Sequence, residues 1–384
     1  MDDWQHGGFG VYIHWPFCLA KCPYCDFNSH VSREIDHKQW RNALLTELRH
    51  SAALTGPRKV DSIFFGGGTP SLMEAKTVAA LIDEVDRLWG IKPGAEISLE
   101  ANPTSVEASK FAAFSKAGVN RISMGIQSLN DIDLKALGRM HSAKEALAAF
   151  DIAKDNFKRV SFDLIYARQN QTPETWFAEL RQALDLAVDH LSLYQLTIEP
   201  GTRFGDLYNK GKLRNLPATE DAADMYLGTR EICADYGLDG YEISNYAQRG
   251  AESRHNLIYW RYGDYAGIGP GAHARLTLDS KRTALHTHLD PKIWLDTVKA
   301  HGHGMQAPEI LTQEDQAIEY LMMSLRLTEG SDMKRYAHLA GHDIPLERIE
   351  GLEKLGMVKT DQDILQTTAK GRPLLNSVLS ELLR

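Results

Sequence analysis

Three closely spaced cysteines constrain this chain more than any other feature of its sequence. They stand as Cys18-x-x-x-Cys22-x-x-Cys25, directly after the apolar run from Val11 to Phe17. Three thiolates on one short loop can ligate three irons of a 4Fe-4S cluster. The fourth iron then has no protein ligand and is open to a small molecule. The spacing therefore predicts a 4Fe-4S cluster held by Cys18, Cys22 and Cys25.

A zinc site is the alternative that the spacing leaves open. Structural zinc takes four ligands, and His14 or His30 could supply the fourth. A disulfide framework fits less well, because the chain has only 4 Cys and Cys233 lies far from the others. We expect Cys233 to be a buried core thiol.

Length and composition bound the class of protein. The 384 residues exceed one ordinary domain, and 43% of them are apolar, so we expect a large domain with a smaller appendage. The net charge is -8 and no run of Lys and Arg occurs, so nucleic acid is not an expected partner. No leader pattern opens the chain, and no window approaches about 18 consecutive apolar residues. These features predict a cytoplasmic protein whose membrane contact, if any, is peripheral.

Residues 10 to 215 alternate β-rich runs with amphipathic helical stretches, which is typical of repeated βα units around a parallel sheet. Six such repeats predict a partial (β/α)6 barrel of the TIM type. In that architecture the chemistry lies on loops at the C-terminal ends of the strands, and the cysteine loop follows the first strand. The expected strands are 11–14, 62–65, 96–100, 121–125, 160–165 and 190–197, and the expected helices include 36–52, 77–88 and 142–155.

The pattern changes after Pro217. Residues 218–238 predict a helix, whereas the Gly-, Tyr-, His- and Asn-rich stretch 239–275 predicts a loop-rich lid or binding segment. We therefore expect a barrel over 1–215 and a barrel extension over 216–305.

The last part of the chain, 306–384, is expected to form a small helical domain. Predicted helices at 317–327, 346–355 and 373–383, with a hairpin at 356–366, resemble a winged helix. This segment has no basic recognition face, so DNA binding is not expected.

Polar residues end several of the predicted strands. The run Gly66-Gly67-Gly68-Thr69-Pro70 can bring backbone N–H groups close to a carboxylate or amine. Glu100, Gln127 and Asp163 belong to the next three strands, and each alone could equally be a satisfied core group. Their convergence from consecutive strand ends favours a binding site.

Several motifs, taken with the three cysteines, match one known family along nearly the whole chain. They are Tyr12-x-His14-x-Pro16-Phe17-Cys18, Gly66-Gly67-Gly68-Thr69-Pro70, Glu100-x-Asn102-Pro103, Gly125-x-Gln127-Ser128, Leu137-Gly138-Arg139-x-His141 and Asp163-Leu164-Ile165-Tyr166. Together they resemble the oxygen-independent coproporphyrinogen III oxidase family of radical S-adenosylmethionine (SAM) proteins.

The resemblance implies a partial (β/α)6 barrel with a small C-terminal helical domain. It also implies a cluster whose open iron chelates SAM, so that electron transfer can generate a 5′-deoxyadenosyl radical. The implied SAM ligands are Tyr12 for the methionine moiety, Gly67, Gly68 and Thr69 for its amino-carboxylate end, Glu100 for the ribose, and Gln127, Arg139 and Asp163 for the rest.

Two departures separate the chain from the oxidases of that family. Those enzymes carry a fourth Cys where this chain has Phe27, and they carry an N-terminal extension where only about ten residues precede the first strand here. Both features resemble the shorter HemW branch of haem chaperones. That resemblance implies haem binding, delivery to acceptor haemoproteins including membrane respiratory enzymes, and dimerisation. Coproporphyrinogen III oxidase activity is the alternative, and an unrelated radical SAM modifying enzyme also stays open.

The segment His255-Asn256-Leu257-Ile258-Tyr259-Trp260 is similar to the His-Asn-x-x-Tyr-Trp motif of that branch. Imidazole is a good axial ligand for haem iron, so His255, on the open side of the barrel, is the predicted ligand. A structural hydrogen-bonding role for His255 is equally open. His273 is the second candidate ligand.

A further departure lies at Ala167-Arg168-Gln169-Asn170, where the family more often has Gly-Leu-Pro-Gly. The geometry of that loop is therefore in question.

Overall fold

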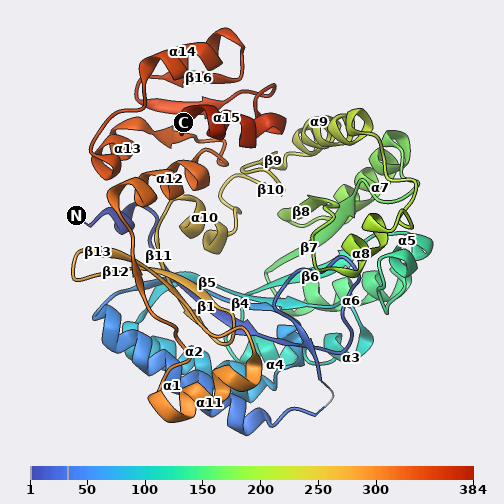
Figure 1. Ribbon diagram of the computed structural model, residues 1–384. Helices are drawn as coiled ribbons and strands as arrows, with labels where there is room; N and C mark the ends of the chain where they lie inside the picture. The colour runs from blue at the N-terminus through green and yellow to red at the C-terminus, as the bar shows by residue number, and fades with distance from the viewer. Residues whose placement is uncertain (1, 33) are drawn as a thin grey trace.

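The computed structural model describes residues 2–32 and 34–384. Within them the largest sheet has 12 strands in the order β14-β13-β12-β11-β1-β4-β5-β6-β7-β8-β10-β9. It curves through the molecule with α1, α2 and α11 on its outer side and the C-terminal elements at one end (Figure 1).

The six central strands are parallel and adjacent, as the sequence predicts for a partial barrel. Apolar residues alternate along them with buried polar residues, such as Ser98, Arg121 and Ser161, which hydrogen bond to one another across neighbouring strands. The six strands are β1 (Phe9–Trp15), β4 (Val60–Gly67), β5 (Ile91–Ala101), β6 (Arg121–Gln127), β7 (Arg159–Tyr166) and β8 (His190–Gln195).

Helices follow these strands, and local capping explains where several of them begin. Ser142 and Glu145 form a capping box at the start of α6, and Asp36 caps α1 through the N–H of Gln39. The helices are α1 (His37–Thr55), α2 (Ala75–Trp89), α3 (Ser105–Ala108), α4 (Phe111–Lys116), α5 (Asp131–Ala136), α6 (Ala143–Asn156), α7 (Pro173–Leu186) and α8 (Arg203–Asn209). No helix in the described residues is long and apolar enough to cross a membrane.

The sheet is extended at both edges by later parts of the chain. Beside β8 lie β10 (Asn245–Ala247) and β9 (Asp239–Gly240), which follow the predicted helix, α9 (Thr219–Asp235). Cys233 is fully buried in α9, as expected. Beside β1 lies β11 (Asp264–Ile268), which runs parallel to it. The remaining elements on that side are β12 (His273–Leu278), β13 (Lys281–His286), α11 (Pro291–His301) and β14 (Glu309–Ile310).

The stretch 239–275, expected to be loop-rich, contains short strands and also a helix that its sequence pattern does not indicate. Arg254–Trp260 forms a helix, α10, whose first residues are capped by the hydroxyl of Ser253 accepting from the N–H of Asn256. Seven residues make only two turns, so no helical periodicity is visible in the sequence.

The C-terminal segment contains the helices and the hairpin expected there, together with one helix that was not predicted, α13. The buried residues of the C-terminal segment form a hydrophobic cluster separate from that of the barrel. The elements are α12 (Gln313–Ser324), β15 (Ser331–Asp332), α13 (Met333–Ala340), α14 (Leu346–Lys354), β16 (Val358–Asp361), β17 (Ile364–Thr367) and α15 (Leu375–Leu382).

Candidate functional site

A cavity of about 150 Å³ lies at the C-terminal ends of the parallel strands. All the predicted cluster and SAM residues line it except Tyr12, which lines the adjoining cavity described below. The predicted residues brought together here are Cys18, Cys22, Cys25, Gly67, Gly68, Thr69, Glu100, Gln127, Arg139 and Asp163.

The cysteine loop is held at its base by a short parallel pair, β2 (Phe17–Cys18) and β3 (His30–Val31). Each cysteine sulfur has a hydrogen-bonding partner in the described residues. Thr69 Oγ1 donates to Cys18 Sγ over 3.4 Å, and Arg139 Nη1 donates to Cys22 Sγ over 3.4 Å. Cys25 Sγ lies 3.9 Å from the hydroxyl oxygen of Ser29. Burial raises the pKa of Cys18 and Cys25, and the donors to sulfur partly offset this by favouring the thiolate, which is the form that ligates iron.

His14 is not available as the fourth ligand of a zinc site. Its Nδ1 lies 3.0 Å from the Tyr12 hydroxyl, and its Nε2 lies 2.9 Å from the carbonyl oxygen of Asn28. Both ring nitrogens are thus engaged, and burial lowers the pKa of His14 to about 4. His30 Nε2 contacts the side-chain oxygen of Asn28 at 3.0 Å. In the part of the chain that is described, no three His, Cys, Asp or Glu side chains are arranged to hold a single metal ion.

Two buried carboxyl groups face the small cavity. Burial, together with the neighbouring charge of Asp163, raises the pKa of Glu100 to about 8. Burial raises the pKa of Asp163 to about 6. Glu100 Oε2 accepts from the Gly67 N–H over 3.2 Å, and Asp163 accepts from the Ser123 hydroxyl over 3.3 Å. A ligand that brings positive charge and hydroxyl donors would favour ionisation of both groups.

Two residues that line this cavity carry a buried polar atom without a protein partner. Gln127 Oε1 and Arg139 Nε are buried and make no hydrogen bond within the described residues. Gln127 has a φ of 72° at an irregular register between β6 and β7, which is an unfavourable backbone conformation for a residue with a side chain. Buried polar groups normally have partners, so these atoms indicate a place for ligand groups.

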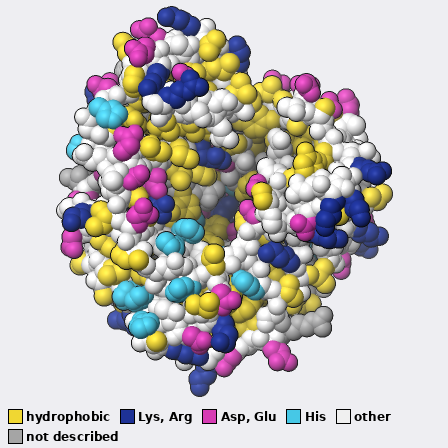
Figure 2. All heavy atoms as spheres, in the orientation of Figure 1, with side chains coloured by type: hydrophobic (Ala, Val, Ile, Leu, Met, Phe, Trp, Pro, Cys, Tyr) yellow, Lys and Arg dark blue, Asp and Glu magenta, His cyan; other side chains and the backbone are white. Residues whose placement is uncertain are grey.

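A second cavity, of about 770 Å³, adjoins the first and shares Lys21, Phe27, Ser29, Gly67 and Glu100 with it. Figure 2 shows it as a hollow in the face of the molecule, with histidine side chains along one side. Its size is within the usual range for cofactor-sized ligands. Its aromatic and imidazole lining consists of Tyr12, His14, Phe27, His30, Tyr259, Trp260, Tyr262, Tyr265 and His273.

His255, the predicted haem ligand, does not line either cavity. It is 2% exposed, its Nδ1 lies 3.0 Å from the Ser62 hydroxyl, and its ring stacks on Phe64 with 4.7 Å between centroids. Its Nε2 has no hydrogen-bond partner in the described residues. On α10, His255 and Tyr259 share one face, and it is Tyr259 that reaches the cavity. The sequence motif predicts that His255 faces the open side of the barrel, but in the structure its side chain is buried.

His273, the second candidate, is exposed and lines the large cavity. Its ring lies 6.1 Å from that of His286 on the neighbouring strand. Burial and the nearby Arg275 and His286 lower the pKa of His273, so its imidazole is neutral near pH 7. Neutral imidazole is the form that binds iron.

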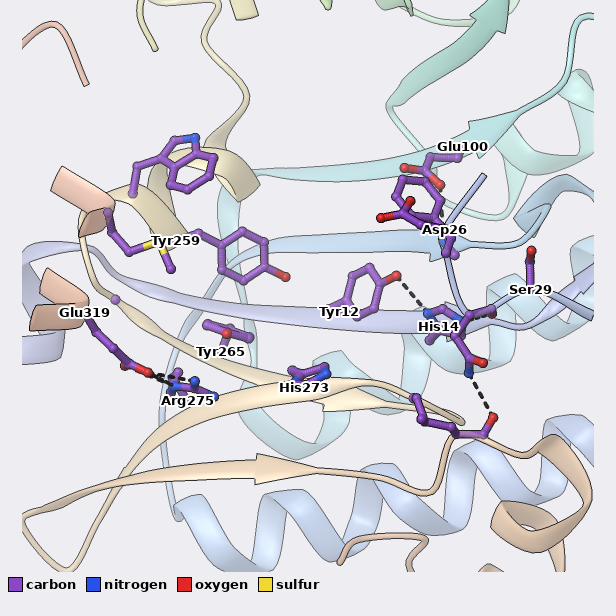
Figure 3. A pocket seen from close by; sticks show the side chains of 18 of the residues that line it. Tyr12, His14, Asp26, Ser29, Glu100, Tyr259, Tyr265, His273, Arg275 and Glu319 are labelled. Atoms are coloured by element: carbon purple, nitrogen blue, oxygen red, sulfur yellow. Dashed lines mark hydrogen bonds and ion pairs between the residues drawn. The ribbon is translucent and has the colours of Figure 1, made fainter. Parts of the chain in front are cut away.

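Sequence reasoning missed Arg275 and Glu319, which also line the large cavity. Arg275 follows His273 by two positions on β12, so both side chains point to the same face (Figure 3). Recognising a strand at 273–278 would have revealed this relation.

The altered loop after β7 keeps a left-handed backbone at both positions where the resembled family has glycine. Ala167 has a φ of 56° and Asn170 a φ of 60°. Arg168 is buried between them and pairs with Asp133 over 2.8 Å and with Glu179. These ion pairs hold the loop in a conformation that Ala167 would not favour alone.

Comparison with known proteins identifies relatives over almost the whole chain. The sequence model of the Radical SAM superfamily matches residues 12–183, and that of the HemN C-terminal domain matches residues 311–374. The heme chaperone HemW of Escherichia coli is 36% identical, with 96% of each chain covered. The mitochondrial radical S-adenosyl methionine domain-containing protein 1 of Mus musculus is 40% identical over 97% of this chain and 87% of that protein.

A solved structure shares the fold. Coproporphyrinogen III oxidase (HemN) from Escherichia coli, described as a radical SAM enzyme, superimposes with a TM-score of 0.82 at 24% identity. The match covers 98% of this chain and 90% of that one.

Proposed function

Because the chain belongs to the radical SAM superfamily and, within it, to the family of the HemW heme chaperones, we propose that it binds haem and delivers it to acceptor haemoproteins. The observation that carries this proposal is the large aromatic cavity with His273 on its wall, directly beside the cysteine cavity. An apolar, planar ligand with a central metal needs aromatic surfaces and a neutral imidazole, and this cavity offers both.

The small cavity fits a 4Fe-4S cluster with SAM on its open iron. Cys18, Cys22 and Cys25 would hold the cluster, and the donors to their sulfurs would stabilise its thiolates. When bound, the reduced cluster would supply an electron to SAM. Glu100 would accept hydrogen bonds from the ribose hydroxyls, and the unpartnered Gln127 Oε1 and Arg139 Nε would meet polar groups of SAM.

We place the haem iron on His273 rather than on His255. His273 is exposed to the cavity, whereas His255 is enclosed between Phe64 and Tyr259. Tyr259 and Trp260, from the same motif as His255, line the cavity and would pack against the macrocycle. In this arrangement the buried ring of His255 packs against Tyr259 and so positions it at the cavity wall.

Haem binding and porphyrinogen oxidation are separable by experiment. The anaerobically reconstituted protein is titrated with haem and followed by absorption, and in parallel it is incubated with SAM, a reductant and coproporphyrinogen III. We expect one haem per chain and no decarboxylated product. Product formation without haem binding would overturn the chaperone proposal in favour of the oxidase alternative.

Delivery needs its own test. Haem-loaded protein is mixed with a haem-free respiratory haemoprotein, in solution and on vesicles, and transfer is followed by the acceptor's spectrum. We expect the acceptor to take up haem faster from the haem-loaded protein than from free haem. The rate at which the loaded protein releases haem without an acceptor is the control.

A further inference from the structure

We propose that Arg275 recognises a carboxylate on the periphery of the bound macrocycle, and that Glu319 occupies this receptor until the ligand's carboxylate displaces it. This inference rests on the proposed haem function and assigns the residue that binds a propionate. On this view the ligand's carboxylate replaces Glu319 as the partner of Arg275.

The geometry of the pair is that of a carboxylate receptor already filled. Arg275 Nη2 donates to Glu319 Oε1 over 2.7 Å, and Arg275 Nε donates to Glu319 Oε2 over 3.1 Å. A two-pronged arrangement of this kind is how guanidinium groups recognise carboxylates. The remaining Nη1 donates to the Ala274 carbonyl over 3.1 Å, which fixes the plane of the group.

Both members of the pair line the large cavity, and neither is sealed from it. The Arg275 and Glu319 side chains are 24% and 22% exposed. The second arginine on the cavity wall, Arg282, differs: its partner Asp264 is fully buried, and it also donates to the Gly263 carbonyl over 2.9 Å. A ligand can therefore reach the Arg275 pair, whereas the Arg282 pair is part of the core.

The receptor stands beside the proposed iron ligand. His273 and Arg275 are two positions apart on β12, so their Cα atoms are separated by about 6.6 Å and their side chains share a face. Figure 3 shows both pointing from this strand toward the tyrosines of the cavity. A ligand with a central metal and peripheral carboxylates can engage both residues at once.

Replacing Glu319 at Arg275 by a ligand carboxylate would also break a contact between the C-terminal segment and the large sheet. Glu319 lies on α12, whereas Arg275 lies in the large sheet, so their ion pair joins the two hydrophobic clusters. A released Glu319 keeps the hydrogen bond from the Tyr262 hydroxyl, at 3.1 Å. One bidentate carboxylate replaces another at Arg275, so the number of charged contacts at that residue is unchanged. Haem binding would thereby loosen α12 from β12.

The test compares haem with its dimethyl ester, whose propionates carry no charge. In the wild-type protein we expect haem to bind about 10- to 100-fold more tightly than the ester. Arg275→Gln should remove this preference by weakening haem binding alone. Glu319→Gln should tighten haem binding several-fold without changing ester binding, because the competing carboxylate is gone.

Arg261→Gln is the matched control, because Arg261 forms a similar pair with Glu329 and does not line the cavity. It should leave both affinities unchanged. Equal wild-type affinity for haem and ester would overturn the inference and leave the haem function standing. A wild-type protein that binds neither compound would instead refute the proposed function. Thermal unfolding of each haem-free variant checks that it is folded. The comparison of haem with its ester in the wild-type protein does not depend on any variant.

Discussion

Arg139 donates a hydrogen bond from Nη1 to Cys22 Sγ over 3.4 Å, although the two residues are 117 positions apart. The same guanidinium donates over 2.7 Å to the Asn102 side chain and over 2.7 Å to the Gly125 carbonyl. The cysteine loop is thus tied to the ends of β5 and β6. This contact places the proposed cluster beside the proposed SAM ligands.

Loss of any one loop cysteine should abolish the cluster. Cys18→Ala, Cys22→Ala or Cys25→Ala leaves two thiolates, which is too few for three ligated irons. Cys233→Ala is the control, because Cys233 is buried in α9. Iron content and visible absorption after anaerobic reconstitution measure the result. A wild-type protein that takes up zinc and stays colourless would contradict the cluster assignment.

SAM affinity should rise with pH up to about pH 8 and then level off. Glu100 has a pKa of about 8 in the cofactor-free protein, and ribose hydroxyls and a cationic ligand favour its ionised form. Binding below pH 8 therefore releases a proton. Glu100→Gln should reduce this release and weaken binding by about 1.5 to 3 kcal/mol, while Asp163, with a pKa of about 6, can still release a proton at lower pH. Calorimetry in two buffers of different ionisation enthalpy measures it; identical heats for the wild-type protein would show that Glu100 does not titrate.

Replacing the two candidate histidines should have opposite consequences. His273→Ala should shift the haem spectrum and weaken binding at least tenfold, with little effect on folding, because His273 is exposed. His255→Ala should keep the haem spectrum and destabilise the fold by about 1 to 3 kcal/mol, because it leaves a buried hole beside Ser62 and Phe64. Haem titrations and thermal unfolding separate the outcomes. Loss of the spectrum in His255→Ala alone would return the ligand assignment to His255.

Because of Glu47, the free energy of unfolding should fall as the pH rises toward neutrality. This buried carboxyl accepts from the N–H groups of Gly269 (2.7 Å) and Gly304 (2.6 Å) and from Trp294, and burial raises its pKa to about 7. Between pH 4.5 and 7 the unfolded chain releases this proton and the folded chain keeps it, so the ionisation favours unfolding.

In Glu47→Gln this pH dependence should disappear, and the variant should be less stable than wild type at pH 5, because its amide NH2 would face one of the two backbone N–H donors. Denaturant unfolding at pH 5, 6 and 7 measures the trend, with Glu309→Gln, an exposed site, as control. Parallel curves for wild type and Glu47→Gln would show that Glu47 is ionised throughout.

The six central strands and the cysteine loop could be predicted from the sequence, because each depends on local pattern. The strands are short segments rich in β-branched and aromatic residues, and in a βα barrel the C-terminal ends of such strands lie on the face that carries the site. Gly67, Glu100 and Gln127 lie at the ends of consecutive strands, so their convergence in one cavity could be expected, whereas Asp163 reaches it from the middle of β7.

The tertiary structure alone decided which residues of the later segment line the large cavity. The sequence motif favours His255 over His273 as the ligand, yet α10 turns His255 into the core while β12 exposes His273. Arg275 and Glu319 meet across 44 positions because α12, which packs against α10 and α13, brings Glu319 within hydrogen-bonding distance of β12. Periodicity reports the conformation of a short segment, whereas the direction of a side chain depends on what packs against that segment, and those neighbours come from distant parts of the chain.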